Sequence, residues 1–138
     1  MHEWALAEAV LTTVLDIAAK ENAEKVLEIN IVMGELQQID METFKFALEN
    51  LVKGTIAENA RIVFETEKAV LKCNVCGYEW SFGEVIEKLD EEAREAIHFI
   101  PEVFHAYIAC PVCGSRDFDV VRGRGVYIKS IKVLGGGK

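Results

Sequence analysis

The sequence predicts an α+β protein with two domains, in which a zinc-ribbon-like domain with four cysteines is inserted into a small α/β domain. Two kinds of pattern lead to this prediction: apolar residues with helical or alternating spacing, and two C-x-x-C-G segments late in the chain. We assign residues 1–71 and 119–138 to the α/β domain, with two helices and a three-stranded sheet, and residues 72–118 to the cysteine domain.

Residues 4–21 and 41–53 are the two predicted helices of the α/β domain. Asp40 is placed to cap the second helix, and Gly54 to end it. In the first helix the apolar residues recur at helical spacing, which indicates one buried face. They are Leu6, Val10, Val14 and Ile17.

Residues 25–33, 61–71 and 125–133 are the three predicted strands. The first alternates apolar and polar residues, which is typical of a half-buried strand. The cysteine domain lies between the second and third strands. The chain therefore returns to the first sheet after the cysteine domain, which ties the two domains together.

Composition limits the classes of function. The chain has 138 residues and a formal net charge of −8, so as a whole it repels phosphate backbones, and we expect no nucleic-acid partner. No apolar stretch is long enough for a membrane span, and we expect no membrane association. The N-terminus does not resemble a signal peptide, and free thiols fit a reducing compartment, so the expected location is the cytoplasm.

The four cysteines form two C-x-x-C segments, 73–76 and 110–113, each followed by glycine. We call each segment a knuckle. A C-x-x-C turn presents two thiolates to one tetrahedral ion, and two such turns complete a closed shell of four thiolates, the pattern of structural zinc. The alternatives are two redox dithiols or two disulfides. A redox C-x-x-C normally follows a strand and opens a helix, and a second matching copy is not expected, so we favour zinc. The predicted ligands are Cys73, Cys76, Cys110 and Cys113.

The chain begins Met1-His2-Glu3, which offers a second donor set. The α-amino group, the backbone nitrogen of His2 and its imidazole can close two fused chelate rings on one ion, and Glu3 can add a backbone nitrogen or a carboxylate. Tetragonal nitrogen and oxygen donors suit Ni(II) or Cu(II). A histidine near a terminus is more commonly a solvated side chain.

The 33 residues between the knuckles, 77–109, exceed what a minimal zinc ribbon needs. Apolar residues at helical spacing and the stop at Pro101 predict an amphipathic helical insertion at about 83–101. This insertion carries His98, which we predict to be a conditional further ligand of the ion at the N-terminus, brought to His2 by rotation of the cysteine domain. The alternative is that His98 caps the C-terminus of its helix. For His105 we favour a surface or hydrogen-bonded side chain.

Several segments together resemble the HypA family of nickel metallochaperones for hydrogenase maturation, in its archaeal form. The resemblance covers nearly the whole chain, although the common family pattern has a shorter segment between the knuckles. It rests on the opening Met1-His2-Glu3, Gly34-Glu35-Leu36, Phe44-Lys45-Phe46-Ala47, Lys53-Gly54-Thr55, the two knuckles and the closing Tyr127-Ile128-Lys129-Ser130-Ile131.

The resemblance implies a nickel site on His2, its neighbouring backbone nitrogens and Glu3, and a structural zinc on the four cysteines. It also implies that Ni(II) is passed to the large subunit of [NiFe] hydrogenase with the GTPase HypB. No nucleophile elbow, phosphate loop or paired-carboxylate motif is present in the sequence, and we predict no enzymatic activity.

Two other classes stay open on the residues alone: a zinc-ribbon adaptor in transcription or RNA processing, and a thiol-redox protein. Charge argues against the adaptor, because residues 72–118 hold four basic and nine acidic residues, the wrong sign for a phosphate-binding domain. An acidic ribbon could still bind a basic protein. A redox protein would need cysteines that cycle, which metal-bound knuckles resist.

Overall fold

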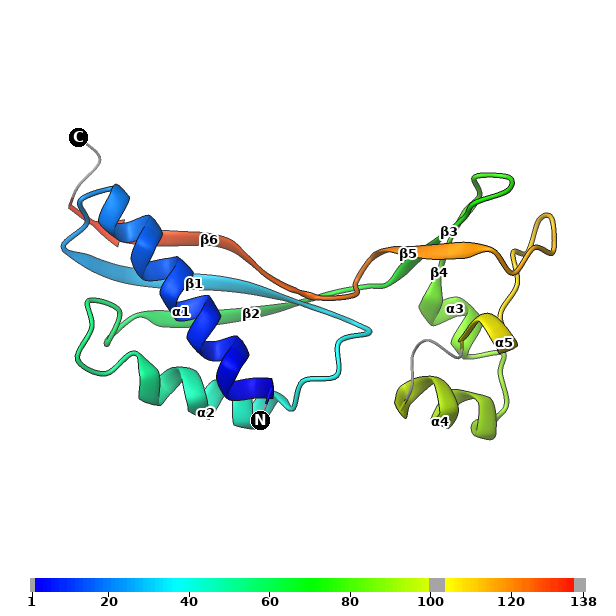
Figure 1. Ribbon diagram of the computed structural model, residues 1–138, viewed down its shortest axis with the longest axis horizontal. Coiled ribbons are helices and arrows are strands. Elements are labelled where there is room, and N and C mark those ends of the chain that lie inside the picture. Colours follow the sequence, from blue (N-terminus) through cyan, green and yellow to red (C-terminus); the bar gives the residue numbers. More distant parts are fainter. Residues whose placement is uncertain (1, 100–103, 136–138) are drawn as a thin grey trace. The chain divides into compact units, whose positions relative to one another are not determined.

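A computed structural model describes residues 2–99 and 104–135, without the side chains of residues 98 and 99 (Figure 1). The chain divides into two compact units. The first unit comprises Met1–Val32, Gln38–Glu65 and Val126–Lys138, and the second comprises Met33–Gln37 and Thr66–Gly125.

The first unit holds two helices and a three-stranded sheet with the strand order β2-β1-β6. Figure 1 shows β1 and β2 running in the same direction and β6 running in the opposite one. The elements are α1 (His2–Lys20), β1 (Lys25–Gly34), α2 (Met41–Leu51), β2 (Arg61–Glu67) and β6 (Val126–Leu134).

Apolar faces at helical spacing hold the first unit together. Asp40 caps α2 as predicted, because its side chain accepts a hydrogen bond from the backbone N–H of Thr43. On α2, Phe44 is fully buried and meets Phe64 of β2 edge to face, with ring centroids 6.0 Å apart. The buried residues of the two helices are Ala7, Val10, Leu11, Val14, Ala18, Phe44, Ala47 and Leu48.

The second unit has its own antiparallel sheet, with the order β4-β3-β5, and three short helices. Its elements are β3 (Val70–Cys73), β4 (Glu79–Ser81), α3 (Phe82–Ile86), α4 (Glu91–Phe99), α5 (Phe104–Tyr107) and β5 (Phe118–Arg122). Leu71 on the central strand pairs with Trp80 on one side and Val120 on the other. Its core combines aromatic and aliphatic side chains, chiefly Leu71, Trp80, Phe82, Ile97, Phe104, Ile108 and Phe118.

The α+β class with a cysteine unit is confirmed, and the largest differences from the prediction lie in two segments. The strand predicted over 61–71 is two strands, β2 and β3, which belong to different sheets. The helix predicted at about 83–101 is divided into α3 and α4 by the turn at 87–90. Pro101, its predicted stop, lies outside the described residues.

Close backbone packing explains why the strand divides before Val70. The backbone N–H of Ala69 turns away from the sheet and donates to the Glu35 carboxylate at 2.7 Å. Gly123 lies directly against Ala69 with φ +82°, and a Cβ there would come within 2.5 Å of the Ala69 Cα. A Cβ at Gly34 would likewise come within 2.4 Å of the Gly123 backbone. The segment Gly34-Glu35 therefore packs against both Ala69 and Gly123.

No described helix has the length and apolar character needed to cross a bilayer.

Candidate metal centre

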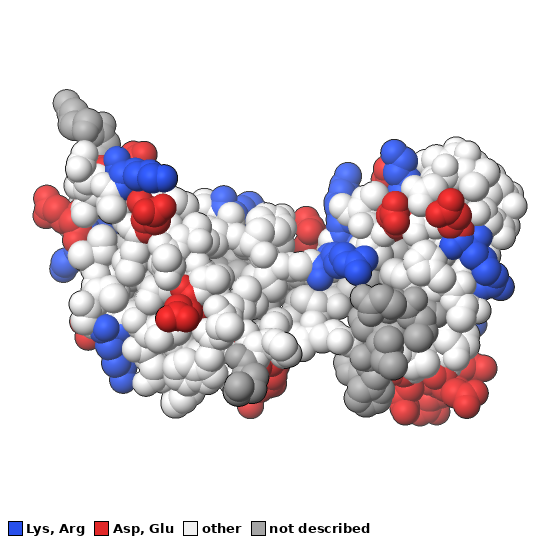
Figure 2. Space-filling model, viewed as in Figure 1, with Lys and Arg blue, Asp and Glu red and all other residues white. Residues whose placement is uncertain are grey.

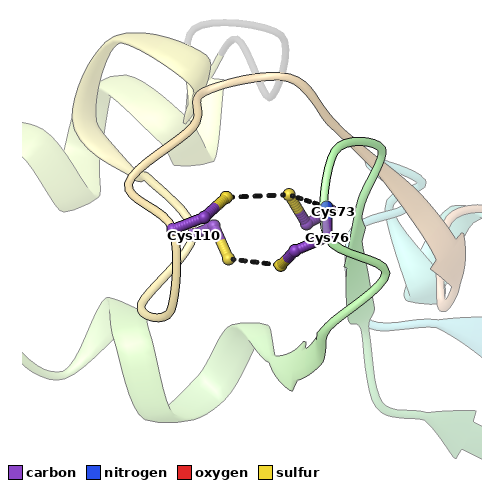
Figure 3. A group of neighbouring side chains, drawn as sticks. Cys73, Cys76 and Cys110 are labelled. Carbon is purple, nitrogen blue, oxygen red and sulfur yellow. Dashed lines mark hydrogen bonds between the residues drawn. The ribbon is translucent and has the colours of Figure 1, made fainter.

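The four cysteine sulfurs converge in the second unit, and all lie within 4.8 Å of one another. Cys73 ends β3 and Cys110 follows α5, so the sheet and the short helix bring the two knuckles face to face (Figure 3). The Sγ atoms of Cys73 and Cys113 are 3.5 Å apart, and those of Cys76 and Cys110 are 3.6 Å apart. This arrangement fits a single tetrahedral ion with thiolate ligands.

Each knuckle is a tight turn that requires its glycine. Gly77 and Gly114 have φ values of +80° and +77°, a conformation that side chains disfavour. Their backbone N–H groups donate to the carbonyls of Cys73 and Cys110, at 3.0 and 2.9 Å, and close the turns.

Backbone N–H groups also point at sulfur. Cys73 Sγ accepts from Val75 and Cys76 at 3.3 and 3.4 Å, and Cys110 Sγ accepts from Val112 at 3.4 Å. The two bonds to Cys73 Sγ, led by the one from Cys76, lower the pKa of the Cys73 thiol to about 7. The lowered pKa favours the thiolate form of Cys73, which is the form that binds a cation. The set of four cysteine sulfurs fits zinc.

Ordinary hydrogen bonds fix the second knuckle from outside. His105 Nδ1 donates to the carbonyl oxygen of Arg116 at 2.9 Å, and the Arg116 guanidinium donates to the His105 carbonyl at 3.1 Å. The imidazole also stacks on Phe118. His105 thus has a structural position, in agreement with the expectation of a surface or hydrogen-bonded histidine.

The N-terminal donor set lies on the first turn of α1. The helix begins at His2, two residues earlier than predicted, and His2 is exposed. Glu3 Oε2 accepts a hydrogen bond from the backbone N–H of Asp40 at 3.0 Å. This bond is the main reason that the pKa of Glu3 falls from 4.5 to about 2, so its carboxylate is charged across the neutral range.

Two predicted nickel ligands cannot be placed. Met1 lies outside the described residues, and so does the side chain of His98, although its backbone belongs to α4. The sequence did not identify Asp40 as a neighbour of Glu3. Thirty-seven positions separate the two residues, and the only sequence signal at Asp40 is its helix cap.

An exposed aromatic pair lies beside the terminal donors. Trp4 and Phe46 are 41% and 56% exposed, and their rings meet edge to face with centroids 6.1 Å apart. Such large apolar side chains at the surface are typical of protein-binding sites.

Comparison with known proteins shows that this chain is similar to one family. The family described as "Hydrogenase/urease nickel incorporation, metallochaperone, hypA" matches residues 1–133. Hydrogenase maturation factor HypA of Pyrococcus horikoshii is 62% identical over 133 residues, or 96% of each chain. The HypA of Thermococcus kodakarensis is 56% identical over the same share of both chains.

Solved structures show the same fold at low sequence identity. The solution structure of the Ni metallochaperone HypA from Helicobacter pylori covers 96% of this chain and 97% of its own, with a TM-score of 0.66 and 18% identity. A second solution structure of a HypA protein covers 97% of both chains, with a TM-score of 0.69 and 19% identity.

Proposed function

The chain belongs to the HypA family of nickel incorporation metallochaperones, and from this premise we propose that it binds Ni(II) at its N-terminus for hydrogenase maturation. In this proposal it passes the ion, together with the GTPase HypB, to the large subunit of [NiFe] hydrogenase. The observation that carries the proposal is the position of His2 and Glu3 on the first turn of α1, with Glu3 fixed by Asp40.

The helix start supports coordination by backbone nitrogen. The first four N–H groups of an α-helix have no partner within the helix. The nitrogens of His2 and Glu3 are in this position, so a metal ion would replace their protons, which would pass to solvent, without breaking a helical hydrogen bond. Together with the His2 imidazole and the free α-amino group, they form the tetragonal nitrogen set that suits Ni(II).

The Glu3 carboxylate supplies negative charge at the same turn. It is already ionised and held by Asp40, so a metal ion does not have to displace a proton from it. It also faces the positive end of the α1 dipole, where a carboxylate is stabilised. This charge offsets the repulsion between the helix dipole and an incoming cation.

The four cysteines hold zinc in a structural role in this proposal. Zinc would cross-link the two knuckles and supply folding energy to the second unit. With four protein ligands its shell is closed, which leaves no open position for exchangeable nickel or for hydrolytic chemistry.

Release of nickel needs a site that a partner can reach. The donors lie at an exposed chain end rather than in a buried cage, and the Trp4–Phe46 pair stands beside them. We propose that HypB docks over this aromatic pair, which would keep the transfer distance short. His98 on α4 remains a proposed additional nickel ligand, and its role is tested separately from the terminus.

The adaptor alternative gains no support from the face drawn in Figure 2. Acidic and basic side chains are interspersed on the face drawn in Figure 2, with no large basic patch for a phosphate backbone.

The delivery proposal is tested by nickel transfer from the loaded chain to the metal-free hydrogenase large subunit, with and without HypB. We expect transfer that requires both HypB and His2. Trp4→Ala and Phe46→Ala should weaken HypB binding and leave nickel binding to the isolated chain unchanged. Transfer that is unaffected by His2→Ala would refute the proposal.

A further inference from the structure

The four cysteine sulfurs divide into two close pairs, and each pair joins one knuckle to the other. Cys73 Sγ lies 3.5 Å from Cys113 Sγ, and Cys76 Sγ lies 3.6 Å from Cys110 Sγ. Figure 3 marks the sulfur–sulfur contacts between the knuckles with dashed lines. The partners are 40 and 34 positions apart in the sequence, so the fold brings them together and the C-x-x-C spacing does not.

Each pair combines a buried cysteine with an exposed one. Cys73 and Cys110 are buried, whereas Cys76 and Cys113 are exposed. The space directly after each exposed cysteine is also open, because a Cβ built on either knuckle glycine would meet no atom within 4 Å apart from its chain neighbours. A small reagent in water can therefore reach one sulfur of each pair, and the other sulfur of that pair lies close behind it.

This arrangement suits a two-step oxidation by a hydroperoxide. An exposed thiolate attacks one oxygen of hydrogen peroxide, the O–O bond breaks, hydroxide leaves, and the sulfur becomes a sulfenic acid. The buried thiolate of the same pair then attacks that sulfur, so that an S–S bond forms and a second hydroxide leaves. The two thiolates lose two electrons, and the peroxide gains them. The sulfurs only have to approach from 3.5 or 3.6 Å to about 2 Å.

We propose that the cysteine cluster is an oxidative modification site, at which hydroperoxides convert the four thiolates into two disulfides between the knuckles, Cys73–Cys113 and Cys76–Cys110. The proposal rests on the zinc role proposed above for the same cysteines. Each disulfide removes two of the four thiolate donors, so zinc and the two disulfides cannot be present together. The reaction modifies a metal site, and it differs from the thiol-redox alternative, in which free cysteines cycle.

Disulfides between the knuckles would hold the second unit together without a metal ion. They close loops of 40 and 34 positions, and a cross-link that closes a long loop constrains the unfolded chain more than one that closes a short loop. Disulfides within the knuckles would leave the two knuckles unconnected. We therefore expect the oxidised second unit to stay folded. Thiols reduce disulfides by exchange, so the modification is reversible, and the reduced chain can be loaded with zinc again.

The test adds hydrogen peroxide to the full zinc-loaded chain and follows the release of zinc with a colorimetric indicator. We expect complete release with about two peroxides per chain, one for each disulfide. Peptide mass spectrometry should then find Cys73 linked to Cys113 and Cys76 linked to Cys110. NMR spectra should show β3, β4 and β5 intact. Dithiothreitol and added zinc should restore the starting protein.

Dimedone, which traps sulfenic acids, tests the order of the two steps. When less peroxide than protein is added, dimedone should label Cys76 or Cys113 and leave their buried partners unlabelled. The matched control is the metal-free chain in urea, in which the folded arrangement is lost. There the two cysteines of each knuckle should pair with one another, because short loops close more readily than long ones.

Four results would each overturn the proposal: links within the knuckles of the zinc-loaded chain, first labelling at Cys73 or Cys110, retention of zinc in the presence of peroxide, or unfolding of the second unit. A purified chain that carries no zinc would refute the zinc role, and this proposal with it. The zinc content measured before peroxide is added distinguishes that failure from the other four.

Discussion

The backbone N–H of Asp40 donates a hydrogen bond to the Glu3 carboxylate at 3.0 Å, which connects the start of α2 to the first turn of α1. The relationship fixes a negatively charged carboxylate one residue from His2, on the first turn of α1. It also explains how a chain terminus can hold a preformed part of the proposed nickel site, although termini are usually poorly ordered.

The first prediction concerns the charge of Glu3. We expect its carboxyl to titrate with a midpoint near 2 rather than near 4.5, because the ionised form accepts the Asp40 hydrogen bond. Since the folded pKa is the lower one, the stability that this bond provides is present above pH 4.5 and is lost as the pH falls toward 2. Carbon-detected NMR of the metal-free chain measures the midpoint, and Glu3→Gln identifies the signal.

The second prediction concerns Asp40. Asp40→Ala should remove the cap of α2, destabilise the first unit by about 1 kcal/mol and loosen the hydrogen bond to Glu3. Asp40→Asn is the matched control, because asparagine caps helices about as well as aspartate. Urea unfolding and nickel titration of both variants make the comparison. Equal nickel affinity in the wild type and the alanine variant would show that the anchoring of Glu3 does not assist binding.

The third prediction concerns zinc. Cys73→Ala or Cys113→Ala should abolish zinc binding and unfold the second unit, because metal binding contributes about 10 kcal/mol or more to folding in such sites. Val75→Ala is the control in the same knuckle, since this side chain is 67% exposed and binds no metal. Metal analysis and NMR spectra should show the first unit still folded. A zinc-free chain with β3, β4 and β5 intact would contradict the assignment.

Sequence periodicity predicted the two helices of the first unit well, because α1 and α2 each bury one regular face. The alternation expected in β1 is only partly present, since Leu27 is exposed and Val32 and Met33 are both buried. The C-x-x-C-G spacing likewise predicted the cysteine cluster, since each half of that site is local. The division of residues 61–71 between two sheets was not predictable. It depends on contacts of Ala69 with Glu35 and Gly123, which are distant in the sequence, and the strand pattern continues through the break.

Contacts between residues that are distant in the sequence also limit prediction of the proposed terminal site. His2 and Glu3 are adjacent in the sequence and were proposed from it as nickel ligands. Asp40 was identified only as a helix cap, because its contact with Glu3 arises from the packing of α1 against α2. Local donors can be inferred from local spacing, whereas the residues that orient them come from tertiary structure.

The fourth prediction concerns His98. If it is a nickel ligand, His98→Ala should weaken nickel binding, most clearly in the presence of HypB, and leave zinc content and folding unchanged. His105→Ala serves as the comparison: it should leave nickel binding unchanged, because His105 is engaged with Arg116 and stacked on Phe118. Equal nickel affinity of His98→Ala and wild type, both alone and with HypB, would remove His98 from the site.

The central claim is that nickel binds at the free N-terminus, and the most direct measurement is a calorimetric nickel titration of the zinc-loaded chain with and without residues added before Met1. We expect tight one-to-one binding only when the α-amino group is free, loss of that binding in His2→Ala, and unchanged zinc content in all three proteins. An extended chain that binds nickel as tightly as the native one would contradict the claim.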